Sequence, residues 1–201
     1  MKMLKRHVII LFLFITVLSL QALAQDVPQE VNKKEQIPLR FLLGGAIEFG
    51  GDEVAEVYFT NGDTQSVNAG QGISFFVGGQ YQFPKVEQLL LRASVGYKYV
   101  TTQADNVHIR LTRVPLIFTA NWVIAEKVRL GAGIAMHQGI NFKADGVGDD
   151  ISFSNASGPI FEIAYRGIGI SYTVMTYKDQ ADLSYSANAF GITLSGVLPK
   201  R

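Results

Sequence analysis

The sequence predicts an all-β protein, specifically an eight-stranded antiparallel up-and-down transmembrane β-barrel. Three observations lead to this expectation. Beyond an apolar N-terminal segment, large apolar residues alternate with small or polar ones in eight segments, which is the period of a strand with one apolar face. The connections between these segments alternate between short and long. Charged residues make up only 17% of the chain, which contains 20 glycines and no cysteine, whereas soluble domains are about 25% charged.

The N-terminal 24 residues have the pattern of a secretory signal peptide. Lys2, Lys5 and Arg6 precede an apolar run over residues 8–20, and Ala22-Leu23-Ala24 is a small-residue cleavage site before Gln25. The alternative is a retained membrane anchor, but the run is shorter than the roughly 20 residues of a membrane-spanning helix. We therefore expect a signal peptide at 1–24, a flexible periplasmic lead-in at 25–38 and the barrel domain at 39–201.

Charge gives no support for a nucleic-acid partner. Removal of Lys2, Lys5 and Arg6 with the signal leaves 15 basic against 17 acidic residues, a net charge of −2. Nucleic-acid-binding domains normally carry a clear basic excess.

The first three strands are expected at 39–50, 70–83 and 89–100. Their alternating apolar sets are Phe41, Leu43, Ile47 and Phe49; Ile73, Phe75, Val77, Tyr81 and Phe83; and Leu91, Ala93, Val95, Tyr97 and Tyr99. The loop at 51–69 contains Asn61-Gly62, a strong signal for a type I′ hairpin turn. We expect a protruding two-stranded flap there, and a short turn at 84–87.

The fourth strand is expected at 107–123, after a connection at 101–106. Val107, Ile109 and Leu111 share one face, but the apolar pattern continues from Val114 one residue out of step. A β-bulge near Thr112-Arg113 would explain the change, because bulges add one residue to a strand and tolerate a neighbouring proline such as Pro115.

The remaining strands are expected at 128–142, 159–165, 168–178 and 185–197. Short turns at 124–127 and 166–167 alternate with longer connections at 143–158 and 179–184. Short turns on one side and longer loops on the other, with an even strand number, are typical of bacterial outer-membrane barrels.

Alternation alone does not distinguish a membrane barrel from a soluble, lipocalin-like ligand-binding barrel with its apolar side inward. The second face favours the membrane barrel, because it is too poor in charge for a water-exposed surface but suits a narrow eight-stranded lumen. Aromatic residues also lie in two bands, as in the interfacial girdles of membrane barrels. The expected interfacial aromatics are Phe83, Trp122 and Tyr165 near the short turns, and Phe49, Tyr97, Tyr99 and Phe142 toward the long loops.

The inward face should hold a charge network. Its expected members are Arg40, Glu48, Arg92, Lys98, Arg113, Arg129 and Glu162. Charges enclosed in this way require pairing and hydrogen bonds. We expect Arg129 to approach Glu162 on the adjacent strand, and Glu48 to meet Arg113 across the barrel. The resulting plug would close the lumen; the alternative is a narrow gated ion path.

The signal "ALA|Q", the G-x-G strands ("LLGGAIEFGG", "GQGISFFVGGQYQF", "LGAGIAM") and the strand count together resemble the small OmpA/OmpX-type outer-membrane β-barrel proteins, over residues 39–197. The resemblance implies assembly by the outer-membrane barrel machinery and contact with membrane lipid and lipopolysaccharide. Such barrels usually end on an aromatic residue, whereas this chain ends "GVLPKR". Either Phe190, Ile192, Leu194 and Val197 supply a variant signal, or assembly is atypical.

No catalytic, cofactor-binding or metal-binding residue is expected. Some barrels of this kind modify lipid A, but acyl transfer needs a nucleophile beside a base, and neither His108 nor His137 has the H-x-S pairing of the deacylases. Asp145, Asp149 and Asp150 lack the spacing of an EF-hand loop, so a solvated loop is favoured over a Ca²⁺ site. We expect a non-enzymatic outer-membrane protein with a structural or surface-interaction role, carried by loops 51–69 and 143–157 as a site for a protein partner.

Overall fold

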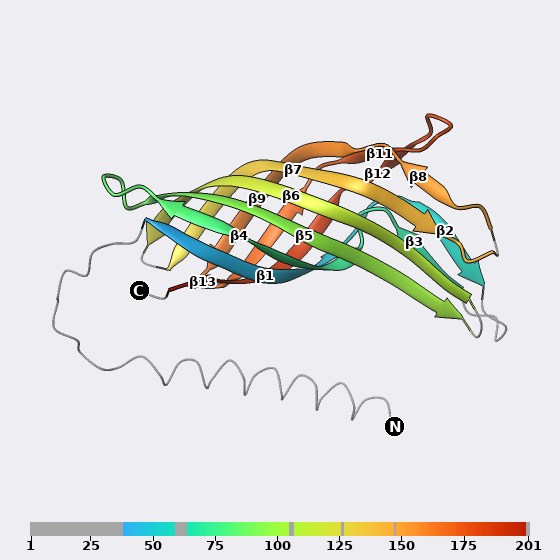
Figure 1. Ribbon diagram of the computed structural model, residues 1–201, viewed down its shortest axis with the longest axis horizontal. Coiled ribbons are helices and arrows are strands. Elements are labelled where there is room, and N and C mark those ends of the chain that lie inside the picture. Colours follow the sequence, from blue (N-terminus) through green and yellow to red (C-terminus); the bar gives the residue numbers. More distant parts are fainter. Residues whose placement is uncertain (1–37, 59–63, 105–106, 126, 147, 200–201) are drawn as a thin grey trace, which may run out of the picture. The chain divides into compact units, whose positions relative to one another are not determined.

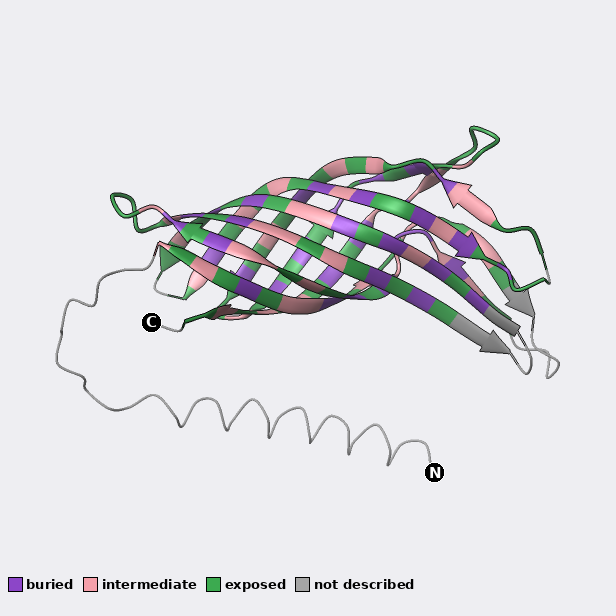
Figure 2. Cartoon of the chain, viewed as in Figure 1, coloured by how far each residue is buried: buried purple, intermediate pink, exposed green. Residues whose placement is uncertain are grey.

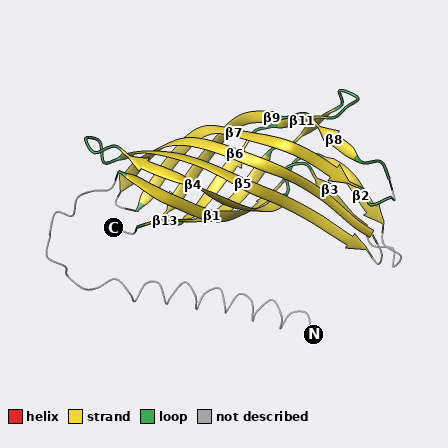
Figure 3. Ribbon diagram, in the orientation of Figure 1, coloured by secondary structure: helices red, strands yellow, loops and turns green. Residues whose placement is uncertain are grey.

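The computed structural model describes residues 38–58, 64–104, 107–125, 127–146 and 148–199. The predicted signal peptide, the lead-in up to residue 37 and the predicted Asn61-Gly62 turn lie outside these residues. Thirteen strands and no helix are found in the described part of the chain (Figures 1 and 3). Accordingly, none of the described residues form a helix long and apolar enough to span a bilayer.

Eight of the strands form a closed antiparallel barrel. In order around the ring they are β1 (Leu39–Phe49), β4 (Gly72–Gln82), β5 (Leu89–Ala104), β6 (Val107–Ala125), β7 (Val128–Lys143), β9 (Ala156–Tyr165), β10 (Ile168–Thr173) and β13 (Ala189–Leu198). The ring is closed by β1 and β13, which pair from Phe41 with Leu198 to Phe49 with Phe190. The predicted fold class is confirmed.

The two ends of the barrel differ in their connections. At one end, here called the turn end, short turns join β4 to β5, β6 to β7 and β9 to β10. At the other, the loop end, lie five further short strands: β2 (Glu53–Tyr58), β3 (Thr64–Asn68), β8 (Ile151–Phe153), β11 (Thr176–Lys178) and β12 (Ser184–Ser186). β2 pairs with β3, β11 pairs with β12, and β8 extends the sheet beside β7.

The predicted boundaries need three corrections at the loop end. β5 reaches Ala104 and β6 starts at Val107, so most of the predicted 101–106 connection is strand. The predicted seventh and eighth strands are each divided, at residues 174–175 and 187–188, because β11 and β12 leave the ring and pair with each other. The sixth strand begins at Ala156, earlier than predicted.

Large apolar residues are exposed on the outside of the barrel, whereas the charged residues Arg92, Lys98, Arg113 and Arg129 are buried. Figure 2 shows this alternation of exposed and buried residues along the strands. Phe75 is 74% exposed and Ile134 is 55% exposed, whereas Arg92 is 8% and Arg113 0% exposed. An apolar exterior around a polar lumen is the arrangement of a transmembrane barrel, and the reverse of a soluble ligand-binding barrel.

A bulge occurs near Thr112-Arg113, as predicted, but the prediction of which strand contains the extra residue is wrong. β6 alternates without interruption, and Ile109, Leu111 and Arg113 all point inward. The register shift does lie opposite Thr112 and Val114, but the extra residue belongs to β7, where Gly139 has a φ of 57°. A bulge of this kind places glycine in the left-handed region.

The apparent change of phase has a different cause, an apolar cluster that fills the loop end of the lumen. We call it the loop-end cap; it consists of Val67, Ala69, Val100, Ile109, Leu111, Ala135, Ile140, Phe142, Ala144, Phe153, Ile160, Met175, Tyr177 and Ala187. Phe142 is 3% exposed within it, so the prediction that Phe142 is an interfacial aromatic is wrong. Beyond the lipid-facing belt, apolar residues of the long strands turn inward because they pack against the cap.

Candidate functional site

The polar lumen contains two groups of charged side chains, one near each end of the barrel. The loop-end group consists of Glu48 on β1, Lys98 on β5 and Arg113 on β6. Lys98 Nζ lies 3.0 Å from Glu48 Oε1 and donates a hydrogen bond of 2.7 Å to the Gly70 carbonyl. Arg113 Nη2 donates to the carbonyl of Gln71. Through these hydrogen bonds, the two cations hold the segment between β3 and β4 in place at the mouth of the barrel.

This arrangement differs from the expected pair of Glu48 and Arg113. Lys98 lies directly opposite Arg113 in the β5–β6 register, and it supplies the ion pair with Glu48. No pattern of side chains in the sequence indicates that backbone carbonyls of the loop are acceptors for these cations.

The turn-end group consists of Arg92 on β5, Arg129 on β7 and Glu162 on β9. Glu162 lies opposite Gly131, two residues from Arg129, and its Oε1 accepts a hydrogen bond from Arg129 Nη2, the contact expected from the sequence. Arg92 Nη1 lies 3.5 Å from the same oxygen, and Arg92 Nη2 donates to Ser195 Oγ at 2.9 Å. One carboxylate thus serves two guanidinium groups.

Arg40 is the last predicted member of the network. It lies on β1, and its Nη2 donates to Gln82 Oε1 at 3.3 Å. The seven predicted residues therefore divide into a loop-end group of three, a turn-end group of three, and Arg40 near the turn end.

The described residues of the lumen line a large cavity and a small one. The larger, of about 690 Å³, lies at the turn end, where its lining includes Arg40, Arg92, Lys127, Arg129 and Arg166. The smaller, of about 60 Å³, lies deeper and is bordered by residues that include Glu48, His137 and Glu162. The lumen therefore narrows from the turn end toward the loop end, where the cap fills it.

His137 lies in the inner part of the lumen, 5% exposed. Its Nδ1 is 2.5 Å from the hydroxyl of Tyr177, and the Arg113 guanidinium lies 5.9 Å from the centre of the Tyr177 ring. His137 thus takes part in the polar layer beneath the cap and makes no hydrogen bond to a serine within the described residues. The side chain of His108 lies outside them.

At the loop end, Asp52 connects two hairpins, a role that sequence reasoning missed. Its backbone N–H donates to Ser186 O and its Oδ2 accepts from Ser186 N, both at 2.7 Å. Its carbonyl accepts from Ala69 N at 2.8 Å. Asp52 follows Gly50 and Gly51, whose φ angles are 114° and 86°. A Gly-Gly-Asp sequence at a strand end is the signal that could have identified this turn.

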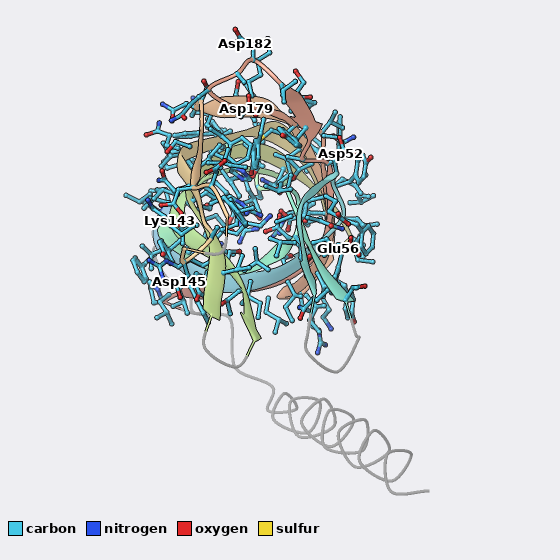
Figure 4. All side chains as sticks on the ribbon, turned by 90° about the vertical axis from the view of Figure 1, so that its right-hand side faces the viewer. Asp52, Glu56, Lys143, Asp145, Asp179 and Asp182 are labelled. Atoms are coloured by element: carbon cyan, nitrogen blue, oxygen red, sulfur yellow. The ribbon has the colours of Figure 1, made fainter. Side chains whose placement is uncertain are left out.

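The exposed surface of the loop end is acidic, as Figure 4 shows for the labelled residues. The charged residues described there are eight acids, Asp52, Glu53, Glu56, Asp145, Asp149, Asp150, Asp179 and Asp182, and three bases, Arg110, Lys143 and Lys178. No group of three or more possible metal ligands occurs among the described residues.

Within the predicted acidic loop, the carboxylate of Asp150 accepts hydrogen bonds from neighbouring residues of the chain. Its Oδ2 accepts from Lys143 Nζ at 2.7 Å and its Oδ1 from Ala144 N at 2.9 Å. These hydrogen bonds, that of Lys143 first, lower the pKa of the Asp150 carboxyl.

The predicted interfacial aromatics other than Phe142 lie on the outer face. Phe49, Tyr97, Trp122 and Tyr165 are each about half exposed, with values from 50% to 54%, and Tyr99 is 37% exposed. Phe83 is half-buried and packs edge-on against Tyr81, with ring centres 5.1 Å apart.

Comparison with known proteins adds little to this description. No family model and no curated protein matches the sequence. Among solved structures, the chain is similar to Ail, the attachment invasion locus protein of Yersinia pestis, at 13% identity over 79% of this chain and 97% of that one, with a TM-score of 0.42. A second structure, Ail in complex with the heparin analogue sucrose octasulfate, matches at the same identity and coverage with a TM-score of 0.43.

At this degree of similarity the assignment depends on the chain's own strand pairing and burial. The closed ring of eight antiparallel strands and the apolar exterior define the class: the chain is a small eight-stranded transmembrane β-barrel.

Proposed function

We propose that the protein is an integral outer-membrane β-barrel without enzymatic activity, which acts through the surface of its loop end. The observation that carries the proposal is the apolar belt on the outside of every barrel strand, combined with the cap that fills the loop end of the lumen. In this reading the turn end faces the periplasm and the loop end faces the outside of the cell, as in other bacterial barrels.

The N-terminal sequence supports the proposed location. The segment 1–24 has the composition of a cleavable export signal, and an exported barrel with an apolar exterior requires insertion into the outer membrane. The proposed partners at this stage are the barrel assembly machinery, membrane lipid and lipopolysaccharide.

Surface interaction is favoured over transport, because the cap and the loop-end charged group obstruct the lumen. The two hairpins linked by Asp52 form a continuous loop-end surface from loop 51–69 to β11 and β12. Loop 143–157 adds the strand β8 at the edge of β7. A protein partner at this surface is therefore proposed.

The charge of this surface indicates what kind of partner it suits. Eight described acids against three bases repel a polyanion, and complementary charge favours association. We therefore propose a partner with a basic contact surface, and do not extend the sulfated ligand of the Ail complex to this chain.

Two measurements test the membrane assignment. Outer-membrane fractions should contain the protein, and its gel mobility without boiling should differ from that after boiling in detergent. Recovery as a soluble periplasmic protein would contradict the assignment.

A third measurement tests whether the barrel conducts. Planar bilayers containing the purified protein should show no stable ion conductance, and the Glu48→Gln and Glu162→Gln variants provide the comparison. Steady conductance by the unmodified protein that either substitution alters would support the narrow ion path instead.

A fourth measurement tests the interaction surface. Cells that carry the protein with residues 54–67 deleted should lose binding to the partner or surface that the unmodified barrel binds. A matched deletion that shortens the turn at 84–87 should retain it. Unchanged binding after the 54–67 deletion would count against a role for this hairpin.

A further inference from the structure

Among the described residues, the lining of the turn-end cavity contains more cations than acids. Its cations come from five segments of the chain: Arg40 on β1, Arg92 on β5, Lys127 and Arg166 in turns, and Arg129 on β7. Glu87 is the one acid among the described residues that line it. Because these segments lie around the ring, the positive charges converge on one volume and are not spread along a single strand.

The ion pairs within the lumen leave part of this charge exposed to the cavity. Glu162 lies beneath the cavity and is shared by Arg92 and Arg129. Both arginines are buried to about nine-tenths, at 8% and 9% exposure. Their Nε atoms are buried and have no hydrogen-bond partner in the described part of the chain. A buried guanidinium N–H without an acceptor is unfavourable, so the shared Glu162 carboxylate does not meet the full donor capacity of the two arginines, and both residues line the cavity.

The loop-end group has a similar excess of positive charge in different surroundings. There, Lys98 and Arg113 also outnumber Glu48, but both donate to loop carbonyls at Gly70 and Gln71. Within the described part of the chain, the acceptors found for Arg92 and Arg129 are the Ser195 hydroxyl and the shared Glu162 carboxylate. Arg113 also has buried Nε and Nη1 atoms without a described partner, but Arg92 and Arg129 line the large cavity at the turn end and Arg113 does not.

The chemistry of the cavity selects an oxyanion. Guanidinium groups recognise phosphate and carboxylate through paired N–H donors, and several converging cations favour a multiply charged group. The side-chain amides of Gln80 and Gln82 add polar groups to the wall. A volume of about 690 Å³ lies within the range of small-molecule sites. Protein walls around the cavity also strengthen the attraction between its charges and an anion.

We propose that the turn-end cavity is a binding site for a small, soluble, phosphate-bearing anion, which enters from the turn end and contacts Arg92 and Arg129. Lys127 and Arg166, both exposed at the mouth, attract the anion, and Arg40 contacts it from the opposite wall. The site is independent of the loop-end surface, so it adds a second function to the barrel.

The test uses the full barrel, labelled with ¹⁵N, in a phosphate-free glycoside detergent. Nuclear magnetic resonance of the arginine Nε–Hε groups follows a titration with sodium pyrophosphate, alongside sodium chloride at matched ionic strength. Pyrophosphate should shift the Arg92 and Arg129 signals to saturation, and sodium chloride should not. Equal shifts with both salts, or no saturation, would overturn the proposal.

Substitutions identify the residues responsible. Arg129→Gln should weaken pyrophosphate binding about tenfold or more, as expected for the loss of a charged hydrogen-bond partner. The double variant Arg40→Gln/Lys127→Gln, which leaves both ion pairs of Glu162 in place, should also weaken binding and remains informative if Arg129→Gln fails to assemble. Arg110→Gln, at an exposed arginine near the loop end, is the matched control and should bind normally. Unchanged affinity in the double variant would overturn the proposal.

A lipid headgroup offers the same phosphate chemistry, so a parallel titration uses micelles of a short-chain phosphatidylglycerol. If these micelles shift the two arginine signals and pyrophosphate does not, the phosphate comes from lipid and the soluble-anion proposal fails.

Discussion

The two ends of the lumen contain similar side chains in different surroundings. Each has two buried cations and one glutamate, Lys98 and Arg113 with Glu48 at the loop end, and Arg92 and Arg129 with Glu162 at the turn end. At the loop end the chain folds back, so backbone carbonyls and the apolar cap complete the surroundings of the charges. At the turn end the turns are short, and the same excess of positive charge faces a cavity.

In this barrel, the length of the neighbouring connection determines whether a buried cation donates hydrogen bonds to the loop backbone or faces a cavity. Where a long connection returns into the barrel mouth, its backbone carbonyls accept hydrogen bonds from the cations, and these bonds hold the connection in place. Where the connection is a tight turn, the cations line a cavity that has room for water or a ligand. The exposed loop-end surface is acidic while the turn-end cavity is cationic, so the two ends suit partners of opposite charge.

The largest decrease in the free energy of unfolding is expected from Lys98→Met. It leaves Glu48 buried without its ion-pair partner and removes the tether to Gly70, and breaking a buried pair in this way costs about 3–5 kcal/mol. The free energy of unfolding in urea, followed in lipid vesicles by gel mobility, measures the loss. The double variant Lys98→Met/Glu48→Gln should recover part of it. Wild-type stability in Lys98→Met would show that the loop-end group is not structural.

A somewhat smaller effect is expected from Leu111→Ala in the loop-end cap. Leu111 is 0% exposed, and truncation of a buried leucine to alanine costs about 2–5 kcal/mol. Leu43→Ala, on the lipid-facing side at 42% exposure, is the matched control and should cost less. Equal losses in the two variants would contradict a packed protein core at the loop end.

Asp52→Ala should have a moderate and local effect. It removes the acceptor of the Ser186 amide, and a net hydrogen bond contributes about 0.5–1.5 kcal/mol. Hydrogen exchange at the Ser186 amide should become faster, while the amides of the β1–β13 seam remain protected. Asp52→Asn keeps a side-chain oxygen and should retain most of the protection; if Asp52→Ala exchanges no faster than wild type, the carboxylate does not hold the two hairpins together.

The smallest effect is expected from Arg166→Gln at the turn end. Arg166 is exposed, and its guanidinium group lies 5.5 Å from the centre of the Tyr165 ring. Surface substitutions of this kind usually change stability by less than about 0.5 kcal/mol. Urea unfolding of the two variants under the same conditions should show a much smaller loss of stability for Arg166→Gln than for Lys98→Met. A loss comparable with that of Lys98→Met would mean that the turn end is as tightly integrated as the loop end.

The barrel was predictable from sequence because lipid and lumen impose opposite requirements on successive residues. In β1, for example, Phe41, Leu43 and Ile47 face outward while Leu42 and Ala46 are buried. The turns after β4, β6 and β9 are short enough to fix the antiparallel order. Contact between Arg129 and Glu162 could be expected because the two residues lie on adjacent strands.

The loop end was less predictable, because there the apolar side of a strand no longer faces lipid. Leu111 and Phe142 were assigned outward on the assumption of one environment along each strand, but both pack into the cap. The partners of Lys98 and Arg113 are backbone carbonyls, which any residue type provides, so no side-chain pattern indicates them. The strands β11 and β12 contain three residues each, too few for a periodicity to appear.

The seam between β1 and β13 has a consequence for biosynthesis. The earliest strand of the ring hydrogen-bonds to the latest, from Phe41 with Leu198 to Phe49 with Phe190. Until β13 has left the ribosome, β1 has an unpaired edge, and such edges promote aggregation. The ring can therefore close only after translation of its final strand, and until then the edge of β1 is open to pairing with other chains.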